Sequence, residues 1–301
     1  MQVFSSYLPI YHPHYKPDDV VRMMKDVGFQ GLAISWEQGN EAYMGVNGRE
    51  QAQLAEKYGL IMEQTHLTCN HNGDLWFDDT RGDAVEEMTI KELHEIAALG
   101  IPVAVTHLTY GPGYGPANPV GIQRLLRIGD AAGKLGVRVA LENTSDTPHL
   151  TYALDAIDHE YIGFCLDTGH QIAYTPHINY LSLYADRLFA MHLHDNDAAG
   201  DLHMIPFDGN ADWERFAAGM RKTEYAYKYL TLEPGSFNYW PYFPLPLEEQ
   251  HRRGKDMKIY GDEGLLKIGK DEYRLYSSLT PVEFMQRQLN ALQRLAGMLG
   301  E

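Results

Sequence analysis

The stretch Leu188-Phe-Ala-Met-His-Leu-His194 has the pattern of a β-strand that ends in two histidines. Its large apolar side chains alternate with Ala190, His192 and His194, so the imidazoles share the opposite face of the strand. The loop that follows adds further possible ligands, namely Asp195, Asp197, Asp201 and His203. Imidazole and carboxylate groups gathered at a strand end are typical ligands of divalent metals, so this stretch predicts a metal site. The alternative is a polar strand end followed by solvated acids.

Seven more segments with strand character alternate with helical segments along the chain. The expected strands are 2–6, 31–35, 60–66, 101–107, 137–142, 162–167 and 229–233, and the expected helices are 17–27, 48–58, 83–99, 120–135, 149–158, 178–185, 212–221 and 281–299. Regular alternation implies parallel strands joined by crossover helices. Eight such units predict an α/β fold, a single (β/α)8 TIM barrel that occupies residues 1–301 as one domain. An open doubly wound sheet is the alternative, but no glycine-rich phosphate turn follows the first strand.

Residues 235–279 form an irregular insertion between the eighth strand and the last helix. A connection of this length is usually either functional or disordered. Its tyrosines, tryptophan and prolines favour ordered packing. We expect a lid over the site or a contact in a homo-oligomer, with peripheral packing as the alternative.

The composition narrows the classes of partner. Lysine and arginine total 25 and aspartate and glutamate total 41, which gives a formal net charge of −16. Nucleic-acid binding depends mostly on basic groups, so DNA and RNA are not expected as partners. No apolar run is long enough to span a bilayer, and the first residues lack the features of a secretion signal. Cys69 and Cys165 form no disulfide framework, so we expect a cytoplasmic protein with both thiols buried.

The alternation within the last four strands predicts which residues face the barrel interior. In each of these strands the large apolar residues face the helices, and the last inward residue can bind a metal: Glu142, Asp167, His192 and Glu233. Active sites of such barrels lie at the C-terminal ends of the strands. Three carboxylates and one imidazole suit Mn²⁺, Co²⁺ or Mg²⁺ and also accept Zn²⁺. Burying these carboxylates together without a cation would cost several kcal/mol each.

Other polar residues fall near the same rim. His66 and His107 end the third and fourth strands, His170 follows Asp167 by three residues, and Asp201 and His203 form an Asp-x-His pair. These side chains are expected to bind substrate oxygens or additional metal ions.

Five short motifs resemble the xylose-isomerase-like TIM-barrel superfamily, also called AP endonuclease family 2. They are Glu142-Asn-Thr144, Asp167-Thr-Gly-His170, Met191-His-Leu-His-Asp195, Asp201-Leu-His203 with Phe207-Asp-Gly209, and Leu232-Glu-Pro234. That superfamily includes sugar phosphate isomerases/epimerases, ketose 3-epimerases, inosose dehydratase and endonuclease IV. The resemblance covers about residues 1–234 and the last helix. It implies that Glu142, Asp167, His192 and Glu233 hold one metal, that Glu142 and Glu233 also move protons, and that His170 contacts a substrate oxygen.

The resemblance favours a metal-dependent sugar or sugar-phosphate isomerase/epimerase that abstracts a proton and forms a metal-stabilised enediolate. One alternative is a polynuclear zinc phosphodiesterase similar to endonuclease IV, whose trinuclear ligand set also matches this chain. His194 and the sequence Phe207-Asp208-Gly209 depart from the endonuclease pattern, and the net charge of −16 disfavours a DNA substrate. The resemblance also leaves open an inosose-type dehydratase and a sugar-binding barrel without activity.

Overall fold

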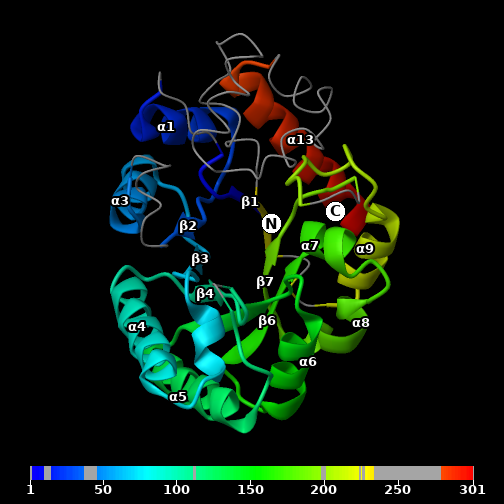
Figure 1. Cartoon of the computed structure of the whole chain (residues 1–301). Helices are drawn as coiled ribbons and strands as arrows, with labels where there is room; N and C mark the ends of the chain where they lie inside the picture. Colours follow the sequence, from blue (N-terminus) through cyan, green and yellow to red (C-terminus); the bar gives the residue numbers. More distant parts are fainter. Residues whose placement is uncertain are drawn as a thin grey trace, which may run out of the picture.

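The computed structural model describes residues 2–9, 15–36, 46–110, 113–197, 201–223, 225, 228–233 and 279–300. Strands occupy the centre of the molecule and helices surround them (Figure 1). The predicted TIM barrel is therefore confirmed. The insertion predicted at 235–279 lies outside the described residues, apart from Leu279, so its proposed role stays a prediction.

Eight parallel strands in the described part of the chain close into the barrel. They are β1 (Val3–Ser6), β2 (Ile34–Ser35), β3 (Thr65–His66), β4 (Val103–Thr106), β5 (Arg138–Glu142), β6 (Ile162–Asp167), β7 (Leu188–His192) and β8 (Tyr229–Leu232). Strands β2 to β7 are neighbours in sequence order, and β1 pairs with β8. Two short links complete the ring. Leu193 bridges to Leu232 beyond β7, and the Ala33 N–H donates to the Ser6 carbonyl at 3.0 Å.

The helices follow the strands as the alternating pattern requires. They are α1 (Pro17–Val27), α3 (Gly48–Tyr58), α4 (Thr80–Ala97), α5 (Pro119–Leu135), α6 (Thr147–Ala156), α7 (Thr168–Tyr174), α8 (Tyr180–Tyr184), α9 (Trp213–Met220) and α13 (Pro281–Leu299), with short 3₁₀ turns at Asn72–Trp76 and Ala185–Arg187. The last helix packs against both α1 and α9, which closes the outer ring (Figure 1). At its start, the Thr280 hydroxyl accepts the Glu283 N–H while Glu283 accepts the Thr280 N–H. None of the described helices is both long and apolar enough to cross a bilayer.

Residues with opposite orientations in the strands form two separate apolar clusters. Val105, Ala140, Cys165 and Ala190 form a small cluster inside the barrel. Their sequence neighbours in the same strands, including Leu141, Phe164 and Met191, belong to the large core under the helices. The predicted alternation is therefore correct for β5, β6 and β7, and it directs the last inward residue of each strand to the C-terminal rim.

The structure corrects several details of the sequence prediction. Strands β2 and β3 begin at Ile34 and Thr65 rather than at residues 31 and 60, and β4 ends at Thr106, one residue before His107. The seventh strand ends at His192 rather than His194, and Leu193 makes only an isolated bridge. Helix α7 was not predicted, because a segment of seven residues containing Thr168 and Gly169 has little helix propensity. Its stability comes from the preceding strand: Asp167 caps the helix and accepts the His170 N–H at 2.6 Å. This cap links the end of β6 directly to His170.

Candidate metal centre

Four strand ends bring the predicted ligands together at the C-terminal rim. Glu142, Asp167 and His192 are the last residues of β5, β6 and β7, and Glu233 directly follows β8. Around His192 Nδ1 lie Glu233 Oε2 at 2.9 Å, Glu142 Oε1 at 3.2 Å and Asp167 Oδ2 at 3.9 Å. One donor atom from each of the four residues lies within 4.8 Å of the others. This spacing suits four ligands around a single ion.

The donor atoms at this position fit a divalent cation. Glu142 is 2% exposed and His192 is fully buried. Within the described part of the chain, Glu142 Oε1, His192 Nδ1 and Glu233 Oε2 nevertheless make no hydrogen bond of acceptable geometry. Buried polar atoms normally have a partner, and unpaired buried carboxylates are costly. Three orphaned donor atoms that converge on one point are what a bound ion would satisfy.

Tyr7 holds the imidazole of His192 from the other side. Its hydroxyl lies 3.0 Å from His192 Nε2, and the Gln64 side-chain amide donates to the same hydroxyl at 3.3 Å. A histidine that binds a metal through one nitrogen usually has its other nitrogen held in this way. The sequence motifs did not identify Tyr7. Its position just after the first strand, at the same rim, was the signal that could have found it.

A second group of side chains lies on the other side of Glu142. His66 Nε2 and His107 Nε2 are 3.2 Å apart, and they lie 3.4 Å and 3.2 Å from Glu142 Oε2. Glu142 therefore faces His192 with one oxygen and this histidine pair with the other. Cys69 Sγ lies 3.6 Å from His66 Nδ1. Burial raises the pKa of the Cys69 thiol, but the His107 and His66 imidazoles outweigh burial and lower it to about 6.

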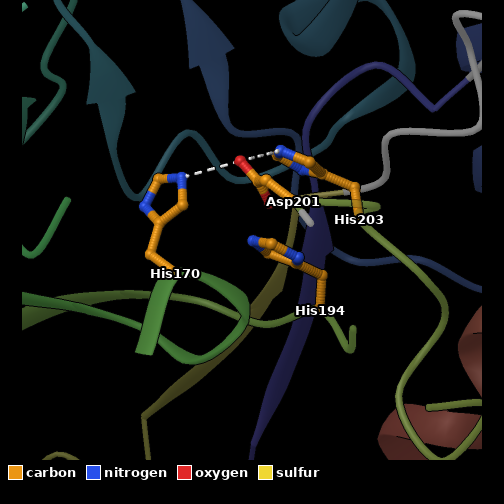
Figure 2. Close-up of side chains that lie close together, drawn as sticks. All are labelled: His170, His194, Asp201 and His203. Carbon is orange, nitrogen blue, oxygen red and sulfur yellow. Dashed lines mark hydrogen bonds and ion pairs between the residues drawn. The ribbon is translucent and has the colours of Figure 1, made fainter. Parts of the chain in front are cut away.

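A third group surrounds Asp201. Figure 2 shows Asp201 between His170 and His203, whose Nε2 atoms lie 3.1 Å and 3.3 Å from Asp201 Oδ2. His170 Nδ1–H donates to the Asn143 carbonyl at 3.0 Å, and His203 Nδ1–H donates to the Glu233 carbonyl at 3.1 Å. A carbonyl can only accept, so these contacts place the proton on Nδ1 and leave Nε2 as the available ligand atom.

Asn196 shapes the loop that carries Asp201 and His203. Its side-chain oxygen accepts the Leu202 and His203 N–H groups at 2.5 Å and 3.1 Å, and its amide donates to the Gly169 carbonyl at 2.7 Å. His203 has φ of 49°, a left-handed conformation that a non-glycine residue adopts at some cost in free energy. The fully buried Asn196 amide therefore offsets the strain that directs the His203 ring toward Asp201.

The Asp195 carboxylate stabilises the loop after β7 and does not belong to the ligand group. The sequence pattern placed it among the possible ligands. The structure shows its buried carboxylate saturated by donors of the same loop and of α9: the N–H groups of Asn196, Phe207 and Ala211 and the indole of Trp213. A carboxylate with this many donors has little capacity left to bind an ion.

The charged groups of the rim shift one another's pKa. Burial lowers the pKa of His203, but the Asp201 carboxylate outweighs it and raises the value to about 10. For His107, Cys69 and Glu142 likewise outweigh burial and raise the pKa to about 9. Burial raises the pKa of Glu142, yet the His192 and His107 imidazoles bring it well below its usual value. These carboxylates therefore favour positive charge beside them, either as protonated imidazoles or as metal ions.

Nine of the residues named from the sequence lie in this connected cluster of three groups: His66, His107, Glu142, Asp167, His170, His192, Asp201, His203 and Glu233. His170 joins the first and third groups, because its Nδ1 lies 3.2 Å from Glu142 Oε1. The structure adds Tyr7, Cys69 and Asn196 as close neighbours that the sequence did not indicate, and it places His194 of the predicted strand end beside Asp167.

Comparisons with known proteins identify the family and the fold of this chain. The profile described as "Xylose isomerase-like TIM barrel" matches residues 18–257. "Uncharacterized protein y4fM" of Sinorhizobium fredii is 39% identical over 67 residues, a match that spans 22% of this chain and only 22% of that relative. D-allulose 3-epimerase from Methylomonas sp. superposes with a TM-score of 0.69 at 16% identity, covering 98% of both chains. A structure described as "IOLI protein with a binding zinc atom" gives a TM-score of 0.69 at 13% identity, again covering 98% of both. At these identities the two structures are evidence for the fold alone.

Proposed function

Because the chain belongs to the xylose isomerase-like TIM barrel family, we propose that it is a divalent-metal-dependent epimerase or isomerase of a sugar or sugar phosphate. The convergence of Glu142 Oε1, His192 Nδ1 and Glu233 Oε2, all buried and orphaned, is the observation that carries this proposal. The overall likeness to a D-allulose 3-epimerase supports a sugar as the substrate. The zinc atom bound by the IOLI protein supports a divalent ion.

The rim residues would have different roles in such a reaction. A divalent ion held by Glu142, Asp167, His192 and Glu233 would polarise a substrate carbonyl and stabilise the enediolate. Glu142 and Glu233 reach the centre from β5 and β8, and the neighbouring imidazoles keep the pKa of both carboxyls low, so both are ionised at neutral pH. One carboxylate removes the proton from the carbon beside the carbonyl. The other glutamate first takes up a proton from solvent and then delivers it to the opposite face of the enediolate. Return to the same carbon gives an epimer, and return to the neighbouring carbon gives an isomer.

In the proposed reaction His170 and His203 would hold the substrate. Both present Nε2 toward Asp201 at the edge of the centre, with Nδ1 fixed on a backbone carbonyl. In this role they would orient a substrate hydroxyl beside the two glutamates, so that the reacting carbon lies within reach of a carboxylate oxygen.

Exchange of substrate hydrogen with solvent tests the proposal directly. The protein, loaded with Mn²⁺, Co²⁺, Mg²⁺ or Zn²⁺, is incubated in D₂O with a panel of free and phosphorylated ketoses, followed by NMR. We expect deuterium at the carbon beside the carbonyl of at least one sugar, together with the epimer or isomer. If metal analysis finds no bound divalent ion, or if no sugar in the panel gains deuterium, the proposal is wrong.

A polynuclear zinc phosphodiesterase is the second candidate, and one observation favours it. Glu142 faces ligand groups with both oxygens, and His170, Asp201 and His203 form a third group, as expected where several ions lie side by side. Closely spaced metals stabilise the attacking and leaving oxygens of a phosphodiester. This candidate predicts more than one equivalent of zinc and cleavage of a duplex with an abasic site. The epimerase proposal predicts solvent exchange in a ketose without DNA cleavage.

A further inference from the structure

The His194 side chain is packed against His203 and against Gly169 of helix α7. It is 1% exposed, and its ring lies flat on the ring of His203, with centroids 4.0 Å apart and planes 2° apart. Figure 2 shows the two rings one above the other, with Asp201 and His170 at their edge. The His194 ring also lies close to Gly169 in α7, where a Cβ atom would come within 1.9 Å of His194 Cε1. Any side chain at residue 169 would therefore displace this ring.

The backbone of His194 is held by the same segment. The Thr168 hydroxyl donates to the His194 carbonyl at 2.7 Å and lies 3.0 Å from the His194 N–H, which donates to it. Thr168 and Gly169 thus hold His194 in two ways. Thr168 makes hydrogen bonds to its backbone, and Gly169 leaves room for its ring because it has no side chain. This explains why the sequence Asp167-Thr-Gly-His170 needs small or hydroxyl side chains at its two middle positions.

The polar edge of the His194 ring contacts a predicted metal ligand. Its Nε2–H donates to Asp167 Oδ2 at 3.0 Å. The other oxygen of Asp167 accepts the His170 N–H at 2.6 Å. Both oxygens of this buried carboxylate are therefore oriented by hydrogen bonds, one from each side. Hydrogen bonds to a ligating carboxylate or imidazole typically change metal affinity by about 10- to 100-fold when they are lost.

The stacked geometry argues against His194 as a ligand of the ion near His203. His194 belongs by distance to the group of His170, Asp201 and His203. An imidazole nitrogen donates its lone pair in the plane of the ring, so a bound ion lies in that plane at about 2.0–2.1 Å from the nitrogen. Two parallel rings with centroids 4.0 Å apart share no such plane. His194 and His203 in these positions cannot both bind one ion.

We propose that His194 is a positioning residue that couples the group of Glu142, Asp167, His192 and Glu233 to the group of His170, Asp201 and His203. Through Nε2 it orients Asp167, and through its face it fixes the His203 ring. This inference rests on the proposed metal centre and adds a residue that binds no ion itself. A change at His194 is expected to alter both groups at once.

Two substitutions separate the hydrogen bond from the ring contact. His194→Phe keeps a ring against His203 but loses the donor to Asp167. His194→Gln keeps an amide donor at a similar distance from the backbone but loses the stacked ring. His149→Gln is the matched control. His149 is also buried, and its Nδ1 lies 2.8 Å from a carboxylate oxygen of Asp146, but neither residue belongs to the metal centre.

Co²⁺ affinity is measured by calorimetry, and the coordination is followed by visible absorption, with the thermal stability of each metal-free protein recorded in parallel. We expect His194→Phe to bind Co²⁺ about 10- to 100-fold more weakly. His194→Gln should keep an affinity within a few fold of the wild type, with an altered absorption spectrum. His149→Gln should change neither quantity. A residue with a merely structural role would lower thermal stability and leave the Co²⁺ affinity of the folded protein unchanged.

Gly169→Ala displaces the His194 ring without changing it, and so keeps the inference testable if His194→Phe does not fold. Alanine within a helix is favoured by about 1 kcal/mol over glycine, and Gly297→Ala in α13 meets nothing within 4 Å. We expect Gly169→Ala to weaken Co²⁺ binding as His194→Phe does, while Gly297→Ala leaves it unchanged.

The results distinguish this inference from the proposed function. If both His194→Phe and Gly169→Ala bind Co²⁺ within twofold of the wild type, the positioning role is wrong and the metal centre stands. If His194→Phe loses a whole equivalent of metal with the remaining affinity unchanged, His194 is a ligand and the inference is overturned. If the wild-type protein binds no divalent ion, both the metal-dependent function and the positioning role of His194 are wrong. Metal affinities that respond as expected without any solvent exchange into a ketose support the inference and contradict the epimerase reaction.

Discussion

The rings of Tyr7 and His192 meet edge to face, 5.2 Å apart between centroids and 86° between planes. These residues lie 185 positions apart in the sequence, and the contact between them places the Tyr7 hydroxyl on His192 Nε2. His192 Nδ1 is thereby directed to Glu142 and Glu233. The pairing of β1 with β8 brings Tyr7 to this position, so closure of the barrel also orients the central imidazole.

Tyr7→Phe should weaken binding of the first divalent ion by about 10-fold, because His192 loses the hydrogen bond that holds its ring. Calorimetric titration with Mn²⁺ or Co²⁺ measures the change. Tyr58→Phe is the control, since the Tyr58 hydroxyl donates to Asp18 at 3.1 Å and contacts none of the rim ligands. Equal affinities of Tyr7→Phe and the wild type would show that Tyr7 does not orient the ligand.

Glu233→Gln should keep much of the bound metal but lose at least about 100-fold in turnover, as expected when a proton-transferring group is neutralised. An amide oxygen still binds an ion, but it cannot accept a proton from carbon at neutral pH. Metal content is measured on the purified protein and turnover by NMR with the ketose found in the panel. Glu87→Gln, at an exposed position of α4, should match the wild type in both. Full activity of Glu233→Gln would exclude Glu233 as the base.

His203→Ala distinguishes a metal ligand from a substrate-binding residue. If His203 binds an ion, the number of metal ions per chain falls, since an imidazole donor is lost. If it binds substrate, the metal content is unchanged and kcat/KM falls. Under the proposed epimerase function we expect the second result, whereas the phosphodiesterase candidate requires the first. Substitution of the exposed His71 by alanine is the control for loss of a histidine. Unchanged metal content and unchanged kcat/KM would leave His203 without either role.

Metal binding should release protons at neutral pH. In the metal-free protein the pKa of His107 is raised to about 9 and that of His203 to about 10, so both imidazoles carry an extra proton at about pH 7. A divalent ion bound to Glu142 and Glu233 would neutralise carboxylates that help to raise these two pKa values, so the imidazoles should release protons as the ion binds. The apparent affinity should therefore rise with pH up to about 9–10. Titrations in two buffers with different ionisation enthalpies count the protons released. A count of zero at neutral pH would contradict these shifts.

The same shifts predict how the metal-free protein responds to alkali. A histidine whose pKa is higher in the folded than in the unfolded state adds stability that is complete below its unfolded pKa, near 6.5. That stability is lost as the pH rises through about 9 to 10. Saturating metal should reduce this loss, because the bound ion replaces the protons.

Glu63→Gln should stabilise the protein at alkaline pH. Glu63 is 2% exposed, and burial raises its pKa from 4.5 to about 7, although Thr231 donates to it at 2.8 Å. Since the folded pKa is raised, charging Glu63 costs stability above about pH 7, and that cost disappears as the pH falls toward the unfolded value. At about 1.4 kcal/mol per pKa unit, the gain is on the order of 3 kcal/mol at about pH 8 and near zero below about pH 4.5.

Urea unfolding of both proteins at several pH values measures this difference in the free energy of unfolding. Glu160→Gln, at an exposed position, should show no comparable dependence on pH. A difference between Glu63→Gln and the wild type that does not change with pH would contradict the raised pKa of Glu63.

The sequence by itself determined the barrel and the inward residues of its last four strands. Alternation with a period of two is a local property, so it assigned Glu142, Asp167 and His192 to the inner rim before any contact between strands was known. The order of strands then required these residues to be neighbours. The family motifs predict which of the rim side chains bind the metal and the substrate.

Only the tertiary structure decided how these side chains are oriented. Three features depend on contacts between segments distant in the sequence: the hydrogen bond that joins Tyr7 and His192, the packing of His194 against Gly169 and His203, and the left-handed backbone of His203. Helix α7 likewise forms because Asp167 caps it from the end of β6, despite its weak propensity. The local sequence pattern predicts which face of a strand a side chain occupies. The distances and ring planes that separate a ligand from a supporting residue arise only when the barrel closes.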